Sequence, residues 1–69
     1  MEIKIIDVAH SVWHEIFSGA RRLRLLSSDD VKNGDCVMFK SGASDSRPYL
    51  ITKHQSHLVG CYVEFVEAN

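Results

Sequence analysis

The residues best suited to chemistry are three arginines that follow a short predicted helix. Arg21, Arg22 and Arg24 lie within four positions, and on a strand Arg22 and Arg24 share one face. Each guanidinium group can fork onto two phosphate oxygens, so this cluster indicates a surface that grips a nucleic-acid backbone. The alternative is a solvated strand face that discourages edge pairing, partly neutralised by the aspartates within 29–35.

The predicted binding set adds cations and one aromatic ring from later segments. Aromatic side chains stack on unpaired bases. Trp13 lies on the apolar helix face and is expected in the core, whereas Tyr49 and Tyr62 are expected to be partly exposed. The predicted nucleic-acid-binding residues are Arg21, Arg22, Arg24, Lys40, Arg47, Lys53 and Tyr49.

The histidines occur as two close pairs. His10 and His14 have the i, i+4 spacing that could place two imidazoles on one metal ion, and His54 and His57 form the second pair. Neither pair has a third ligand nearby in the sequence, so we predict no metal site. His10 and His14 are expected near solvent at the helix start, while His54 or His57 could hydrogen-bond a ligand from a loop.

Composition limits the functions that are available. The chain has 69 residues, a net charge of −1 and a pI near 6.4. One small core is expected, with no room for a large cofactor, so no cofactor is predicted. The charge is far from the strongly basic balance of proteins that neutralise many phosphates, so any nucleic-acid binding must be local.

The first residues lack the basic start and continuous apolar stretch of a signal peptide, and no segment is long enough to span a bilayer. We therefore expect a cytoplasmic protein with no membrane association. Cys36 and Cys61 are then most simply reduced residues packed in the core.

The hydrophobic pattern predicts one helix among several strands. The spacing of Val12, Trp13, Ile16 and Phe17 predicts a two-turn helix over 11–18 whose anchors are Trp13, Ile16 and Phe17. Ser11 is suited to the N-cap, and Gly19 to the left-handed position after the last turn. Strands are expected over 2–8, 21–26, 36–39, 49–52 and 61–66, with a loop over 41–46.

Short connections between these strands favour mainly antiparallel pairing and leave no room for βαβ crossovers. The predicted fold class is therefore α+β and mostly β. It is a small five-stranded, mainly antiparallel sheet, strongly bent or forming a partly open barrel, with one short helix after the first strand. Residues 1–69 are expected to form a single domain.

Two stretches resemble the ASCH domains of the PUA-like superfamily, closest to small phage and bacterial members of unknown function. The run over 13–26 has the family's helix ending in a small residue and glycine, followed by its charged strand. The run Asp30-Val31-Lys32-Asn33-Gly34-Asp35 is similar to its glycine-aspartate turn, and 60–66 to its closing strand. The resemblance spans most of the chain. It implies a PUA-like barrel with a nucleotide or RNA segment in the groove between helix and second strand.

The family's strand motif, G-x-K-x-x-E-x-R, is altered here. Gly19 matches the glycine, but Arg21 stands at the lysine, Arg24 at the glutamate and Leu26 at the arginine. In members that hydrolyse an acetylated cytidine, that lysine and glutamate take part in the chemistry. An arginine keeps its proton near neutral pH, and Arg24 cannot act as a carboxylate. We therefore predict no catalytic residues, and a binding module rather than an enzyme.

Three functions follow from these observations. The first is a small non-catalytic module that binds RNA or another nucleic acid through the arginine-rich strand. The second is a phage or mobile-element protein that binds and modulates a host protein, which the near-neutral charge and small size suit. The weakest is a modified-nucleoside amidohydrolase. A monomer or weak dimer is expected.

Overall fold

The computed structural model describes residues 2–26 and 31–68. Within these residues six strands and one helix follow one another: β1 (Ile3–Asp7), α1 (His10–Phe17), β2 (Arg22–Leu25), β3 (Cys36–Ser41), β4 (Ser44–Asp45), β5 (Tyr49–Ser56) and β6 (Cys61–Glu67). The mostly-β composition and the single short helix after the first strand are as predicted. No helix in the described part of the chain is both long enough and apolar enough to cross a bilayer.

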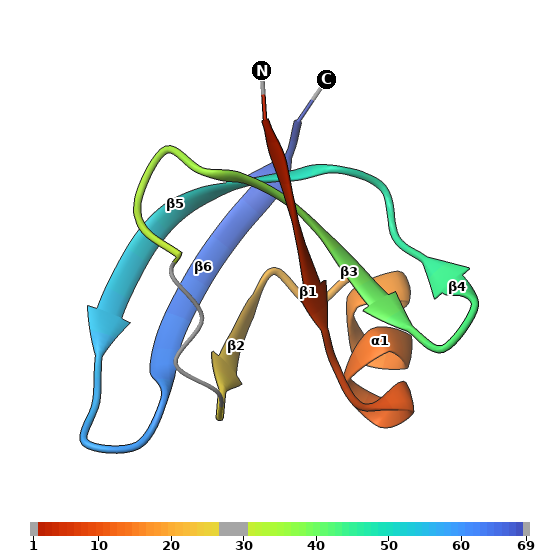
Figure 1. Cartoon of the computed structure of the whole chain (residues 1–69), viewed down its shortest axis with the longest axis horizontal. Coiled ribbons are helices and arrows are strands. Elements are labelled where there is room, and N and C mark those ends of the chain that lie inside the picture. The colour runs from red at the N-terminus through yellow and green to blue at the C-terminus, as the bar shows by residue number, and fades with distance from the viewer. Residues whose placement is uncertain (1, 27–30, 69) are drawn as a thin grey trace.

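The strands form one bent, mixed sheet in the order β1-β3-β5-β6-β2, with β4 added to β3 (Figure 1). Within the described residues the sheet is not closed into a barrel, because β1 and β2 are its two ends. The other pairings are antiparallel, but β1 runs parallel to β3. The expectation that no parallel crossover would fit is therefore wrong. The chain between β1 and β3 contains both α1 and β2, which gives it the length to return in the same direction.

Helix α1 begins one residue earlier than predicted. Its N-cap is Ala9, which makes no side-chain capping bond, so the prediction of Ser11 as the N-cap is wrong. The backbone N–H of Val8 donates to the Lys40 carbonyl, which holds the chain on the sheet until just before the helix. The helix therefore starts directly after the chain ends its pairing with β3.

The end of α1 follows the prediction. Gly19 has a φ of 117°, a region open mainly to glycine. The N–H of Gly19 donates to the Ile16 carbonyl, and that of Ala20 donates to the Glu15 carbonyl, which is the Schellman arrangement. This stop turns the chain into β2.

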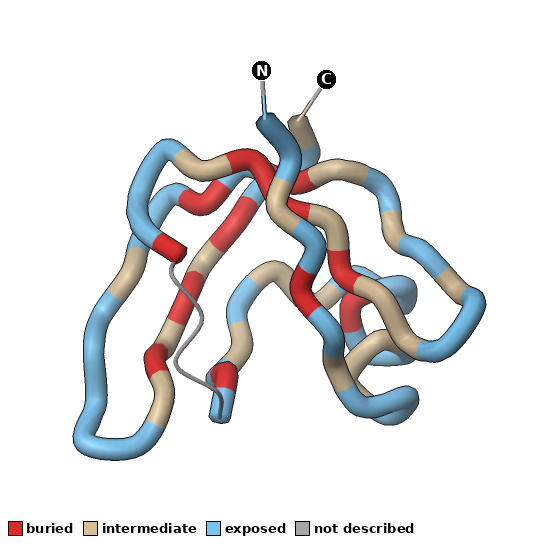
Figure 2. The backbone as a smooth tube through the Cα atoms, in the orientation of Figure 1, coloured by how far each residue is buried: buried red, intermediate tan, exposed pale blue. Residues whose placement is uncertain are grey.

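The core lies on the concave face of the sheet, and α1 contributes the buried Ile16 to it. Its largest fully buried side chains are Phe39, Phe65, Ile16, Ile51, Val37 and Val63. Figure 2 shows buried positions recurring along β6. They are Cys61, Val63 and Phe65, which are buried in alternation as predicted. Cys36 and Cys61 are both buried, also as predicted.

One predicted helix anchor does not enter the core. Ile16 is 1% exposed and Trp13 packs against the core at its edge, but Phe17 is 75% exposed. The prediction for Phe17 is wrong because successive helical residues point about 100° apart, and the inward direction belongs to Ile16.

Pairing between strands extends regular structure beyond the hydrophobic pattern. β5 continues to Ser56 rather than ending at residue 52, because its polar second half pairs with β6 as far as Ser56 opposite Cys61. The loop predicted over 41–46 contains β4, and beside it the Ser46 hydroxyl accepts a hydrogen bond from the Phe39 N–H.

Gly60, at the turn between β5 and β6, provides a test of backbone constraint. Its φ is +77°, and a Cβ there would overlap the Leu25 carbonyl of β2. Gly42 has a similar φ of +60° but open space around it. We expect Gly60→Ala to lower the free energy of unfolding by about 3 kcal/mol or more, and Gly42→Ala by only about 1 kcal/mol. Urea denaturation of both variants checks this; equal losses would show that the contact with β2 is unimportant.

Asp35 provides a test of pH dependence. Its Oδ2 accepts bonds of 3.0 Å from the Lys4 Nζ and from the Lys32 N–H, which together lower the pKa of the carboxyl group. A lowered folded-state pKa stabilises the fold above the unfolded value of about 4, and this stabilisation is lost as the pH falls through the folded pKa. We expect Asp35→Asn to destabilise the protein at pH 7, and its difference from wild type to shrink as the pH falls below about 4. Lys4→Met should give the same trend in acid-dependent thermal melts, and a difference that is constant with pH would contradict this.

Candidate nucleic-acid interface

A groove of about 510 Å³ lies where α1, the start of β2 and the segment before β5 meet. Its walls combine aromatic rings, two arginines and two carboxylates. The lining residues are Trp13, Ile16, Phe17, Arg21, Asp45, Ser46, Arg47, Tyr49 and Glu67. Of the predicted binding set, the structure brings Arg21, Arg47 and Tyr49 together here.

Arg21 is held firmly in this groove. The Phe65 N–H donates to the Arg21 carbonyl, so Arg21 continues the line of β2 and turns its side chain to the core side of the sheet. Its Nη1 donates to the carbonyls of Ile16 at 3.2 Å and Ala20 at 2.9 Å, and its Cζ lies 5.0 Å from the centre of the Tyr49 ring. Two bonds leave donors among the five guanidinium N–H groups, so an anion can still be bound.

The ring of Tyr49 lies under the guanidinium group of Arg21 and contacts its face. This ring is 4% exposed and packs against Phe39 and Phe65, at centroid distances of 5.9 and 5.1 Å. The prediction that Tyr49 would be partly exposed is therefore wrong, since the inward face of β5 places its ring in the core. It contributes to the groove by holding a guanidinium group through a cation–π contact rather than by stacking on a base.

The opposite wall carries a weaker ion pair. Arg47 Nη1 lies 3.5 Å from Glu67 Oε1, with the two side chains 82% and 43% exposed. Exposed pairs of this kind contribute little, so a phosphate can compete for Arg47. With Asp45 also lining the groove, its two arginines face two carboxylates. The groove therefore suits a ligand with few charges and hydrogen-bonding groups of both kinds.

A stacked aromatic pair, the exposed Phe17 on the half-buried Trp13, forms the helix side of the groove. The rings of Trp13 and Phe17 are stacked, with centroids 5.3 Å apart and planes within 10°. The buried Trp13 Nε1 has no hydrogen-bond partner among the described residues. The sequence prediction placed Phe17 in the core and so missed this aromatic pair, although the i, i+4 spacing of Trp13 and Phe17 was the available signal.

The arginine cluster is divided between two faces. Arg22 and Arg24 lie on the convex face of β2, opposite Glu64 and Tyr62 of β6, whereas Arg21 faces the groove. Arg24 Nη2 donates to the Val59 carbonyl at 3.3 Å. The alternation of side chains along a strand separates these neighbours, so the three arginines do not form one anion-binding patch.

The remaining predicted cations also lie outside the groove. Lys53 Nζ is 4.0 Å from Glu64 Oε2, and Lys40 of β3 is in register with Asp7 and Asp45. Glu64 further accepts a bond of 2.8 Å from the Tyr62 hydroxyl, which raises the pKa of Tyr62.

The aspartates within 29–35 were expected to neutralise part of the arginine cluster, but Asp35 binds Lys4 instead of an arginine. Asp29 and Asp30 lie outside the described residues. Within the described part of the chain, no three His, Cys, Asp or Glu side chains gather in a way that could hold a metal ion.

Comparisons with protein-family models, curated proteins and solved structures found no match to this chain. The resemblance to ASCH domains therefore stays a prediction.

Proposed function

We propose that this protein is a non-catalytic module that binds a short single-stranded RNA segment in the groove beside α1. The observation that carries the proposal is that one groove holds both the fixed guanidinium group of Arg21 and the stacked aromatic pair of Trp13 and the exposed Phe17. Single-stranded recognition uses these two elements together, since bases stack on aromatic rings while the backbone contacts cations.

The small number of cations in the groove limits how many nucleotides it would bind. Among the described residues, Arg21 and Arg47 are the only cations that line the groove, and Glu67 shares Arg47. The net charge of −1 adds no general attraction for a polyanion. The ligand would therefore be one or two nucleotides at a chain end or in a loop, held by stacking as much as by charge.

Salt titration of RNA binding tests this proposal. With fluorescein-labelled octauridine, two phosphate contacts predict a slope of log affinity against log salt of about −1.4, which is about a sevenfold loss between 50 and 200 mM salt. Arg47→Ala should reduce the slope to about −0.7, because one contact is removed. Phe17→Ala should weaken binding by roughly tenfold with the slope unchanged, since it removes stacking and no charge.

Arg24→Ala is the matched control, because it removes the same charge from the convex face of the sheet. It should leave both affinity and slope close to those of the wild type. A flat salt response, or an equal effect of Arg24→Ala and Arg47→Ala, would overturn RNA binding in this groove.

A second candidate, binding of a protein partner, is favoured by the convex face of the sheet. Cross-strand register places Ile3 beside Cys36, Cys36 beside Leu50, and Leu50 beside Val66. Ile3, Leu50 and Val66 are 42%, 38% and 47% exposed, and Ile5 is 56% exposed. Exposed apolar residues that lie together mark surfaces that contact other proteins.

If this candidate is right, the protein will capture a protein partner, and nuclease treatment will not remove that partner. In a pull-down from cell extract, the captured band should persist after nuclease and disappear with Leu50→Lys, which places a charge in the apolar row. Gln55→Lys, at an exposed position further along the same strand, should retain it. A band removed by nuclease, or lost equally with both variants, would contradict a partner on this face.

A further inference from the structure

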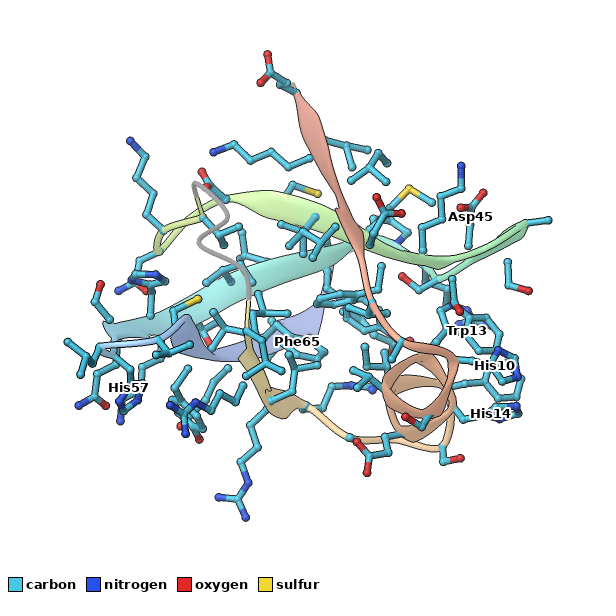
Figure 3. All side chains as sticks on the ribbon, turned by 60° about the horizontal axis from the view of Figure 1, so that its bottom comes forward. His10, Trp13, His14, Asp45, His57 and Phe65 are labelled. Atoms are coloured by element: carbon cyan, nitrogen blue, oxygen red, sulfur yellow. The ribbon has the colours of Figure 1, made fainter. Side chains whose placement is uncertain are left out.

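His10 and His14 form a close pair on the outer side of α1. They are the first and fifth residues of the helix, and both are exposed. Their ring centroids lie 4.6 Å apart with the planes at 88°. Figure 3 shows the two imidazoles projecting side by side from the helix, next to Trp13.

The separation of the two rings fits one metal ion. In zinc sites the metal–nitrogen distance is about 2.1 Å, and the ring centre lies about 1.1 Å further, so each centroid is about 3.2 Å from the ion. Two such rings at angles between square and tetrahedral would then have centroids about 4.5 to 5.2 Å apart. The observed 4.6 Å falls within this interval, so the spacing of the two rings suits one shared ion.

The missing third ligand led the sequence to predict no metal site, but the ring geometry favours one; we propose that His10 and His14 together bind a divalent ion of the zinc, nickel or copper class, with water completing the coordination. Neutral imidazole nitrogens favour these ions, whereas magnesium and calcium prefer oxygen ligands. Two histidines one helical turn apart on one face is the arrangement that helical zinc sites use. The absence of a third protein ligand among the described residues makes the site open rather than structural.

The site lies one aromatic ring away from the groove. The Trp13 ring is 6.4 Å from that of His10 and 5.8 Å from that of His14, and Trp13 lines the groove. A bound divalent ion would thus add positive charge beside a groove whose own arginines and carboxylates are equal in number. The proposal itself stands apart from RNA binding, because it concerns the metal alone.

Isothermal titration of the whole chain with zinc chloride at pH 7.5 tests the site. We expect one ion per chain. His10→Ala and His14→Ala should each weaken binding by more than the roughly 10- to 100-fold that loss of a supporting partner costs in metal sites. Magnesium chloride should show no binding.

His54→Ala and His57→Ala are the matched controls, since each removes one histidine away from α1. Both should bind zinc as the wild type does, and zinc should raise the thermal midpoint of wild type and controls but not of His10→Ala or His14→Ala. Circular dichroism confirms that each variant is folded. Absence of zinc binding by the wild type, or an equal loss in His57→Ala and His10→Ala, would overturn the assignment.

Discussion

The packing of one eight-residue helix against a bent sheet positions the groove and its aromatic rings. A helix of two turns does not persist in water by itself, so α1 depends on contacts outside it. Ile16 supplies the main contact, being buried in the same cluster as Phe39 and Phe65. At the same C-terminal end of the helix, Arg21 donates to the Ile16 and Ala20 carbonyls after the Schellman turn. One side chain therefore both satisfies the helix end and supplies one of the two cations of the groove.

The alternation of strand residues explains why only part of the basic cluster is available in one place. Arg21 follows the core side of β2, while Arg22 and Arg24 follow the convex side, near Tyr62 and Glu64. The two faces consequently have different character. The concave side offers a groove with balanced charges and aromatic rings, and the convex side offers apolar residues of β1, β5 and β6 with scattered ion pairs. Recognition of a long polyanion needs a continuous basic surface, and neither face has one among the described residues.

Helix α1 also brings three aromatic rings into parallel stacking. His10, Trp13 and Phe17 lie along one side of the helix, with planes within 7° and 10° of each other. Spacings of three and four residues put these rings above one another, which the helical repeat requires. The column joins the groove at Phe17 to the histidine pair at His10, so a ligand at one end and an ion at the other would contact the same element.

The sequence alone determined the periodic features: the helix and its glycine stop at Gly19, the inward positions of β6, and the burial of Cys36 and Cys61. These depend on local conformation and on hydrophobic spacing, which neighbouring residues encode. Only the tertiary structure decided that β1 is parallel to β3, that Phe17 is exposed and Tyr49 buried, and that Arg21 parts from Arg22 and Arg24. Each of these depends on which distant strand lies alongside and which face of the sheet the helix covers, and those contacts join residues far apart in the chain. For the same reason only the pairing of β5 with β6 places Glu67 beside the predicted Arg47.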